Sequence, residues 1–139
     1  MSQTTGLIQT HRGNPTVKKY VRATVYVDYC SDFTYVHLMS KNDSEATVEA
    51  KLAFESIYDS YGVKALHYHV DNGLFDTKHF KGACYIAKLT LRFCGVKAHD
   101  QNGESENRIK DVTIGSRTNI LHAAHFWPYS IHASLWNSV

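Results

Sequence analysis

The sequence contains little cysteine, and its cysteines show no regular spacing. Among 139 residues there are three, Cys30, Cys84 and Cys94. They are odd in number, lie far apart and form no C-x-x-C pair, which argues against a disulfide framework and against a cysteine-based zinc site. Each is therefore expected to be a small buried residue. The same usage favours a reducing compartment inside the cell, nuclear or cytoplasmic.

Long apolar runs are also missing. No run approaches the ~18 residues of a membrane-spanning helix, and residues 1–14, MSQTTGLIQTHRGN, have neither the basic start nor the apolar core of a secretion signal. No membrane is therefore expected among the partners. With 43% hydrophobic and 20% charged residues, the composition is that of a globular protein, and the length predicts a single domain over residues 1–139.

The sequence lacks a large excess of either charge. The net charge is +2, with nine histidines besides. Such a balance neither requires nor excludes a nucleic-acid partner. A DNA-binding surface on this chain would therefore have to be a local patch of basic residues.

The first half of the chain predicts a hairpin followed by a helix. Residues 20–29 and 33–39 are rich in β-branched and aromatic types, which are typical of strands. The helix is expected to begin with Ser44 as its N-cap and to end at Gly62. Its apolar stripe, at helical spacing, comprises Ala46, Ala50, Ala53, Phe54, Ile57 and Tyr61. Residues 1–17 are polar and turn-rich, so a loop is expected there.

The second half alternates strands and helices. The expected elements are, in order, a strand at 63–71, a helix at 77–90, a strand at 91–97 and a long helix from Glu104 to about Phe126. Gly82 weakens the first of these helices, and Gly115 is expected to interrupt the second. Antiparallel strands that lead into β-α-β alternation predict a mixed sheet with helices packed on it.

The segment HYHVDNG, residues 67–73, supports two interpretations. In the first, Asp71 is the functional residue, because it ends a strand, where ligands and catalytic groups of open α/β sheets gather. In the second, His67 and His69 share a strand face with Asp71 as zinc ligands. H-x-H-x-D resembles the zinc-binding segment of metallo-β-lactamase-type hydrolases, although that family has another histidine where this chain has Asn72. Further ligands would come from His79, His99, His122, His125 or His132.

The segment QNGESEN, residues 101–107, places two carboxylates at the start of a helix. Acidic residues in a first helical turn are expected from the helix dipole alone. Glu106 becomes a candidate functional residue when it is considered together with Asp71. The two lie 35 positions apart, one at a strand end and one at a helix start.

This arrangement resembles the catalytic core of retroviral and retrotransposon integrases. Those domains carry an aspartate followed by a turn of the Asp-Asn-Gly type, and then a glutamate at a similar separation in a Q-x-N-G-x-x-E segment. VYVDYCSDFTYVHLMSKNDSEATVEAKLAF, residues 25–54, is similar to the hairpin and first helix of the Copia-type branch. FWPYSIHASLWN, residues 126–137, is similar to the end of that core. The resemblance covers residues 20–137.

The resemblance implies an RNase H-like mixed sheet flanked by helices and metal-dependent DNA strand transfer. It implies that Asp71 and Glu106 are catalytic and bind Mg²⁺ or Mn²⁺, which prefer oxygen ligands. Lys110, Asn102 and Arg117 are the implied nucleic-acid-binding residues, since basic groups near the site would meet DNA phosphates. DNA is the implied partner, and a homo-oligomer is possible.

The chain departs from this pattern at its start. The family carries a first aspartate on its first strand, whereas residues 1–19 contain no Asp or Glu. The chain is therefore expected to lack that strand and to be truncated at its N-terminus. Glu104 also stands where the family commonly has an apolar residue. Two functions stay open: strand transfer impaired by the missing aspartate, and a catalytically inactive nucleic-acid-binding or vestigial domain.

Overall fold

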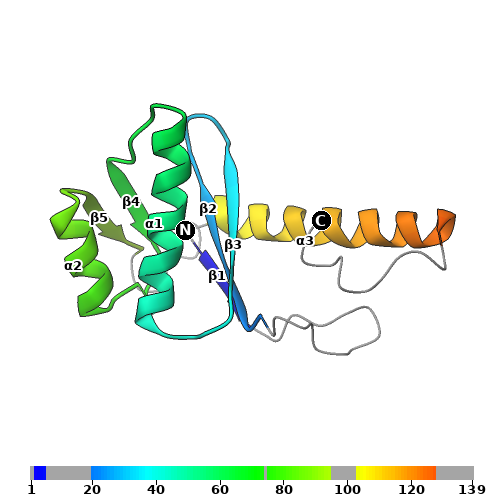
Figure 1. Ribbon diagram of the computed structural model, residues 1–139, viewed down its shortest axis with the longest axis horizontal. Coiled ribbons are helices and arrows are strands. Elements are labelled where there is room, and N and C mark those ends of the chain that lie inside the picture. Colours follow the sequence, from blue (N-terminus) through cyan, green and yellow to red (C-terminus); the bar gives the residue numbers. More distant parts are fainter. Residues whose placement is uncertain (1, 6–19, 74, 95–102, 128–139) are drawn as a thin grey trace.

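The computed structural model of the chain describes residues 2–5, 20–73, 75–94 and 103–127. Figure 1 shows two small sheets with α1 and α2 packed beside them and α3 extending away from the rest. The elements are, in chain order, β1 (Ser2–Thr5), β2 (Arg22–Val27), β3 (Thr34–Met39), α1 (Ser44–Ser60), β4 (His67–Val70), α2 (Lys78–Ile86), β5 (Thr90–Phe93) and α3 (Gly103–Phe126).

The strands form one antiparallel sheet and one parallel pair. The first sheet has the order β1-β2-β3, and both of its pairings are antiparallel. The second consists of β4 and β5, paired in parallel with His67 opposite Thr90 and Val70 opposite Phe93. Antiparallel and parallel pairing thus occur together with helices in the described residues, which confirms the mixed α/β fold class predicted from the sequence.

The strand β1 was not predicted. Its sequence, Ser-Gln-Thr-Thr, lies in the segment expected to be a loop, yet Ser2 pairs with Val25 and Thr5 with Arg22. Polar residues of this kind have a modest strand preference, and the pairing with β2 decides the outcome. A strand therefore occupies the edge of β2 opposite β3. The segment GLIQT, residues 6–10, lies outside the described residues.

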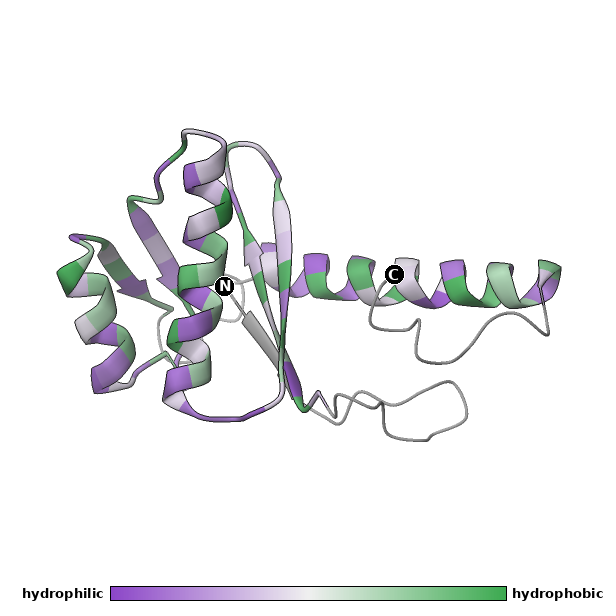
Figure 2. Ribbon diagram, in the orientation of Figure 1, coloured by the Kyte–Doolittle hydropathy of each residue, from purple (hydrophilic) through white to green (hydrophobic). Residues whose placement is uncertain are grey.

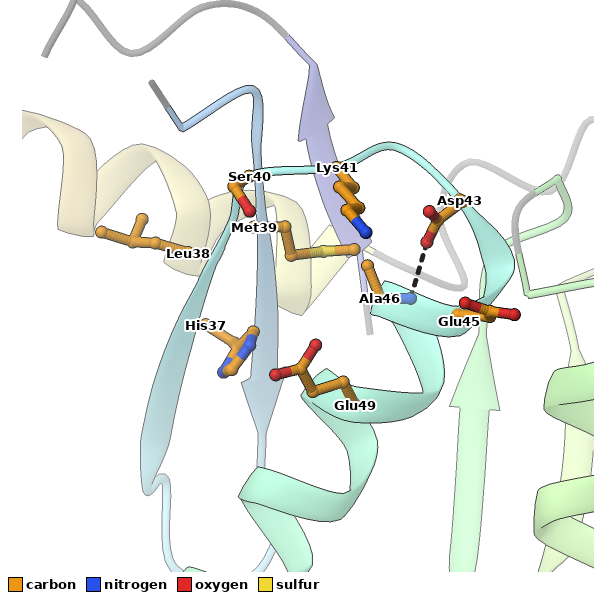
Figure 3. A pocket seen from close by; sticks show the side chains of 9 residues that line it. All are labelled: His37, Leu38, Met39, Ser40, Lys41, Asp43, Glu45, Ala46 and Glu49. Atoms are coloured by element: carbon orange, nitrogen blue, oxygen red, sulfur yellow. Dashed lines mark hydrogen bonds between the residues drawn. The ribbon is translucent and has the colours of Figure 1, made fainter. Parts of the chain in front are cut away.

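The helix α1 begins one residue earlier than predicted. Asp43, and not Ser44, is the N-cap: its Oδ1 accepts a hydrogen bond of 2.8 Å from the backbone N–H of Ala46 (Figure 3). Ser44 is the first helical residue, and its hydroxyl lies 2.9 Å from the Nδ1 atom of His79. At the other end, Gly62 has a φ of 72°, the left-handed conformation that ends helices and favours glycine.

The buried face of α1 is more polar than its apolar stripe predicted. Ala46, Ala50 and Phe54 are buried as expected, but Tyr61 is exposed and Lys51 is only 1% exposed. Lys51 forms an ion pair of 2.8 Å with Glu55, and the hydroxyl of Tyr68 donates a 3.1 Å hydrogen bond to the same carboxylate. These bonds satisfy a charge that would otherwise be costly to bury.

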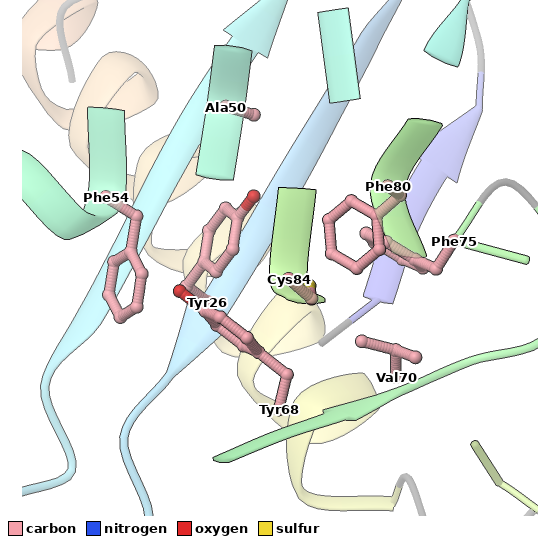
Figure 4. Close-up of a cluster of buried hydrophobic side chains, with 8 residues drawn as sticks. All are labelled: Tyr26, Ala50, Phe54, Tyr68, Val70, Phe75, Phe80 and Cys84. Carbon is pink, nitrogen blue, oxygen red and sulfur yellow. The ribbon is translucent and has the colours of Figure 1, made fainter. Parts of the chain in front are cut away.

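The core lies between α1, α2 and the strands, and aromatic rings fill much of it (Figure 4). Tyr26 of β2 stacks on Phe54 of α1, with ring centroids 4.5 Å apart. Phe80 of α2 meets Phe75 edge to face, with ring centroids 5.2 Å apart. Cys84 is buried in this cluster as predicted, whereas Cys30 is exposed, contrary to the prediction.

The remaining element boundaries differ modestly from the prediction. The strand expected at 63–71 is limited to β4. The helix expected at 77–90 ends at Ile86, because Ala87 caps it and Lys88 turns the chain with a φ of 55° before β5 begins at Thr90. Gly115 does not interrupt α3, which is continuous. Hydrophobic and hydrophilic residues alternate along α3 (Figure 2), and within the described parts of the chain no helix is both long and apolar enough to cross a membrane.

Candidate metal and nucleic-acid site

Asp71 follows the last residue of β4, at the carboxyl end of the parallel pair. The neighbouring strand β5 ends beside it, because the backbone N–H of Cys94 donates a 2.9 Å hydrogen bond to the carbonyl of Val70. The next residue, Asn72, donates a side-chain hydrogen bond of 2.8 Å to the carbonyl of Cys94. Gly73 then adopts a φ of 117°, which glycine accommodates readily. The Asp-Asn-Gly sequence thus ties the turn to the end of β5 and leaves Asp71 exposed.

Glu106 lies near the start of α3. Its neighbour Ser105 is only 1% exposed and fixes the first turn against the protein, and α3 contacts β2 and β1. Glu106 and Glu104 themselves are exposed. Carboxylates in this turn also interact favourably with the N-terminal end of the helix dipole.

The thiol of Cys94 shows that the two carboxylates face one region. Burial is the main cause that raises the pKa of Cys94, and the negative charges of Asp71 and Glu106 both raise it further. Charges act in this way on a thiol only at short range. The Nε2 atom of His69 lies 3.1 Å from the same sulfur. Asp71 and Glu106 therefore both lie within electrostatic range of the Cys94 thiol.

The basic residues predicted to bind DNA lie further along α3. Lys110 and Arg117 are exposed, and at about 3.6 residues per turn they share one face of the helix with Glu106. Arg108 is engaged differently, because its guanidinium forms an ion pair with Asp32 in the turn between β2 and β3. Asn102 lies outside the described residues.

The donor atoms at this point fit a single Mg²⁺ ion better than a pair of ions. Mg²⁺ is usually held by one or two carboxylates, with water and substrate phosphate as its remaining ligands, and Asp71 and Glu106 can supply such carboxylates. Within the described residues, no group of three or more His, Cys, Asp and Glu side chains is arranged to hold a metal ion. A third protein ligand is therefore not provided by the part of the chain that the structure describes.

The histidines are dispersed. His69 contacts Cys94, His79 contacts Ser44, and His122 and His125 pack against Phe126 at the far end of α3. His99 and His132 lie outside the described residues. The described histidines thus do not assemble the zinc site that the H-x-H-x-D segment allowed.

Two residues near the site, Cys94 and Tyr29, were not predicted from the sequence. Cys94 was expected only to be a small buried residue, and His69 was considered only as a zinc ligand. Burial raises the pKa of Tyr29, and the charge of Glu104 and the Cys94 thiol raise it further, so Tyr29 lies within electrostatic range of the start of α3. The alternating positions of His69 in β4 and Asp71 just after it were a usable signal. Contacts between β4 and the end of β5 leave no such signal in the local sequence.

The antiparallel sheet, the parallel pair and the three helices define a mixed α/β domain with the fold of retroviral integrase catalytic cores. The catalytic core of HTLV-2 integrase, solved in complex with magnesium in a trimeric form, is 23% identical over 88% of this chain and 74% of its own, with a TM-score of 0.59. The same core in its dimeric form is 20% identical over 98% of this chain and 79% of its own, with a TM-score of 0.61. The catalytic core of BIV integrase is 14% identical over 98% of this chain and 77% of its own, with a TM-score of 0.56.

The similarity lies in the three-dimensional structure. No protein-family model and no curated protein matches the sequence. At identities of 23% and below, the solved structures show the fold that this chain shares with integrase catalytic cores.

Proposed function

We propose that the chain is an integrase catalytic-core-like domain of a Copia-type retrotransposon. In this proposal it binds DNA along α3 and binds Mg²⁺ or Mn²⁺ through Asp71 and Glu106. The observation that carries the proposal is the position of Asp71 at the carboxyl end of the parallel β4–β5 pair, where Asn72 is bonded to the Cys94 carbonyl, with Glu106 in the first turn of α3. Two supporting facts are the integrase fold and the magnesium named for the HTLV-2 core.

The chemistry of strand transfer explains why carboxylates matter. When two metal ions are bound about 3.5–4 Å apart, they activate the attacking oxygen and stabilise the leaving oxygen of a phosphodiester. Asp71 and Glu106 would hold metal at the DNA backbone. Residues 1–19 contain no carboxylate side chain, so the two residues have no partner there to bridge a second ion. We therefore expect strand transfer by this chain to be impaired.

Residues of α3 would hold the DNA. Lys110 and Arg117 continue the face of Glu106 away from the carboxylates, so a strand that places a phosphate at the metal would pass both side chains. Such contacts position a duplex without reading its sequence. Neutralising each residue should reduce the slope of log affinity against log salt by about one.

The first test measures metal binding. Mn²⁺ titration followed by electron paramagnetic resonance should show a site that Asp71→Asn or Glu106→Gln weakens strongly. Glu45→Gln is the matched control, because Glu45 is likewise an exposed carboxylate in the first turn of a helix. Equal Mn²⁺ affinity in the native chain and in the Asp71→Asn Glu106→Gln double variant would refute the metal site.

The second test separates the enzyme from the inactive DNA-binding domain. Nicking of a supercoiled plasmid that requires Mg²⁺ and disappears in Asp71→Asn supports the impaired enzyme. Salt-sensitive DNA binding without nicking, weakened by Lys110→Gln and Arg117→Gln but not by Lys78→Gln on α2, supports the inactive domain. The absence of both activities would contradict both the impaired enzyme and the inactive DNA-binding domain, and would favour a vestigial domain.

A further inference from the structure

A cavity of about 690 Å³ opens beside the candidate site. It lies between the turn after β2, the C-terminal half of α1 and the start of β4, with Arg92 of β5 at its border. Its volume is within the range of about 300–1,000 Å³ that is typical of small-molecule sites. The carboxylates Asp71 and Glu106 are not among its walls, so this cavity is distinct from the proposed metal site.

The charge of the walls favours an anion. The basic side chains are Lys64, His67, His69 and Arg92, and the only described acidic side chain in the wall is Asp28. Asp28 is already engaged, because its carboxylate accepts a 2.8 Å hydrogen bond from the backbone N–H of Ser31 and another bond from the Ser31 hydroxyl. Lys64 and Arg92 are exposed, so their charges face solvent at the mouth of the cavity, and the His67 ring is exposed beside them.

The remaining walls favour a flat apolar group. Tyr29 is 60% exposed, and Val63 and Leu66 are also exposed at the cavity. Tyr58 and Tyr68 line it from α1 and β4. An aromatic ring open to solvent beside exposed aliphatic side chains can stack on a planar ligand, and each such stack contributes substantially to the binding of unpaired bases.

The cavity is directly connected to the metal site by His69. This residue lines the cavity, and its Nε2 atom lies 3.1 Å from the sulfur of Cys94. A ligand in the cavity could thus contact His69, which also contacts Cys94 at the end of β5. We propose that the cavity binds an unpaired nucleotide of DNA, with its base on Tyr29 and its phosphate near Lys64 and Arg92. This inference rests on the proposed function and names the part of the DNA that the chain recognises.

The test uses the whole chain and a short DNA duplex. One form of the duplex is blunt, and the other carries a single-stranded overhang with the fluorescent base 2-aminopurine. All titrations contain EDTA, so they do not depend on metal binding. The overhang form should bind more tightly than the blunt form, and its 2-aminopurine fluorescence should be quenched by stacking on binding.

Matched variants locate the effect. Tyr29→Leu should weaken overhang binding by roughly fivefold or more, as expected from the loss of one stacked base, and should abolish the quenching. Tyr85→Leu is the control, because Tyr85 is an 84% exposed tyrosine on α2, away from the cavity. Arg92→Gln and Lys64→Gln should also weaken overhang binding, and Lys78→Gln should not. All these positions are exposed, and thermal melting checks that each variant folds.

Three results would overturn the inference. These are equal affinity for blunt and overhang DNA, equal effects of Tyr29→Leu and Tyr85→Leu, and displacement of the overhang by an oligoglutamate peptide of equal charge as efficiently as by an unlabelled oligonucleotide. If Lys110→Gln weakens DNA binding but substitutions of Tyr29 and Arg92 leave the affinity unchanged, only the cavity inference fails. If no DNA binds at all, the proposed function fails with it.

Discussion

The Nε2 atom of His69 lies 3.1 Å from the sulfur of Cys94 and connects the two strands of the parallel pair where they end. His69 belongs to β4, two residues before Asp71, and Cys94 directly follows β5. Asn72 is also bonded to the Cys94 carbonyl, so Cys94 contacts β4 through its side chain and the turn after β4 through its backbone. This residue therefore supports the candidate site without being one of the proposed ligands.

The environment of Cys94 makes a prediction about thiol reactivity. Cys94 is 6% exposed, and burial followed by the charge of Asp71 raises the pKa of its thiol, whereas Cys30 is exposed. Since the thiolate is the reactive form, iodoacetamide should label Cys30 first and Cys94 much later at pH 7. Asp71→Asn should accelerate the labelling of Cys94. The control Asp59→Asn, which changes an exposed aspartate near the C-terminal end of α1, should not. Peptide mass mapping over time measures both rates; labelling of Cys94 as early as Cys30 would contradict its burial.

The core makes a prediction about stability. Phe54 is 3% exposed and packs between Tyr26 and Tyr58, with ring centroids 4.5 and 4.3 Å away. Phe54→Ala should lower the free energy of unfolding by about 3–5 kcal/mol, because it removes buried apolar surface and leaves a cavity. Leu52→Ala on the exposed side of the same helix should change it by less than about 0.5 kcal/mol. Urea titrations monitored by circular dichroism give both values, and similar losses would show that Phe54 is not part of the core.

Much of the fold was predictable because its signals are local. The order of strands and helices from β2 to α3 follows from residue types and helical spacing within single segments. What local patterns did not reveal depends on distant partners. The strand β1 exists through its pairing with β2, and Lys51 is buried because Glu55 and Tyr68 compensate its charge.

In the candidate site, too, sequence patterns revealed some residues and missed those whose contacts are distant in the sequence. Asp71 and Glu106 were predicted from a resemblance that spans the chain, since no local pattern can show that a strand end and a helix start meet. The structure brings them near Cys94, and their roles as metal ligands stay predictions. Cys94 and Tyr29 were missed because their neighbours lie on other elements, far away in the sequence.

The buried tyrosines make a prediction about alkaline pH. Burial raises the pKa of Tyr26 and Tyr68 above the usual value, and raises the pKa of Tyr58 to about 12. The folded state therefore binds these protons more tightly than the unfolded state, whose tyrosines ionise near pH ~10. This contribution to stability is fully present below pH ~10 and is lost as the pH rises through the folded-state values.

Unfolding above pH ~10 should therefore coincide with a cooperative rise in absorbance at 295 nm. Tyr68→Phe removes one of these groups and should weaken the pH dependence, while at pH 7 it should cost about 1 kcal/mol through the lost hydrogen bond to Glu55. Tyr85→Phe is the control on the protein surface. Smooth ionisation of all tyrosines before any loss of circular dichroism would show that Tyr26 and Tyr68 are accessible in the folded chain.

The start of α1 allows a direct test of which residue caps the helix. Asp43 accepts a hydrogen bond from the N–H of Ala46, whereas Ser44 is the first helical residue and its hydroxyl contacts His79 on α2. Asp43→Ala should lower the free energy of unfolding by about 1 kcal/mol, as is typical for the loss of an N-cap. Ser44→Ala should cost less, because its contact is exposed and alanine is a good helix former. Asp43→Asn should retain most of the stability, since an asparagine side chain also caps well. If Ser44→Ala proved the more destabilising change in urea titrations, the helix would begin as the sequence alone predicts, with Ser44 as its cap.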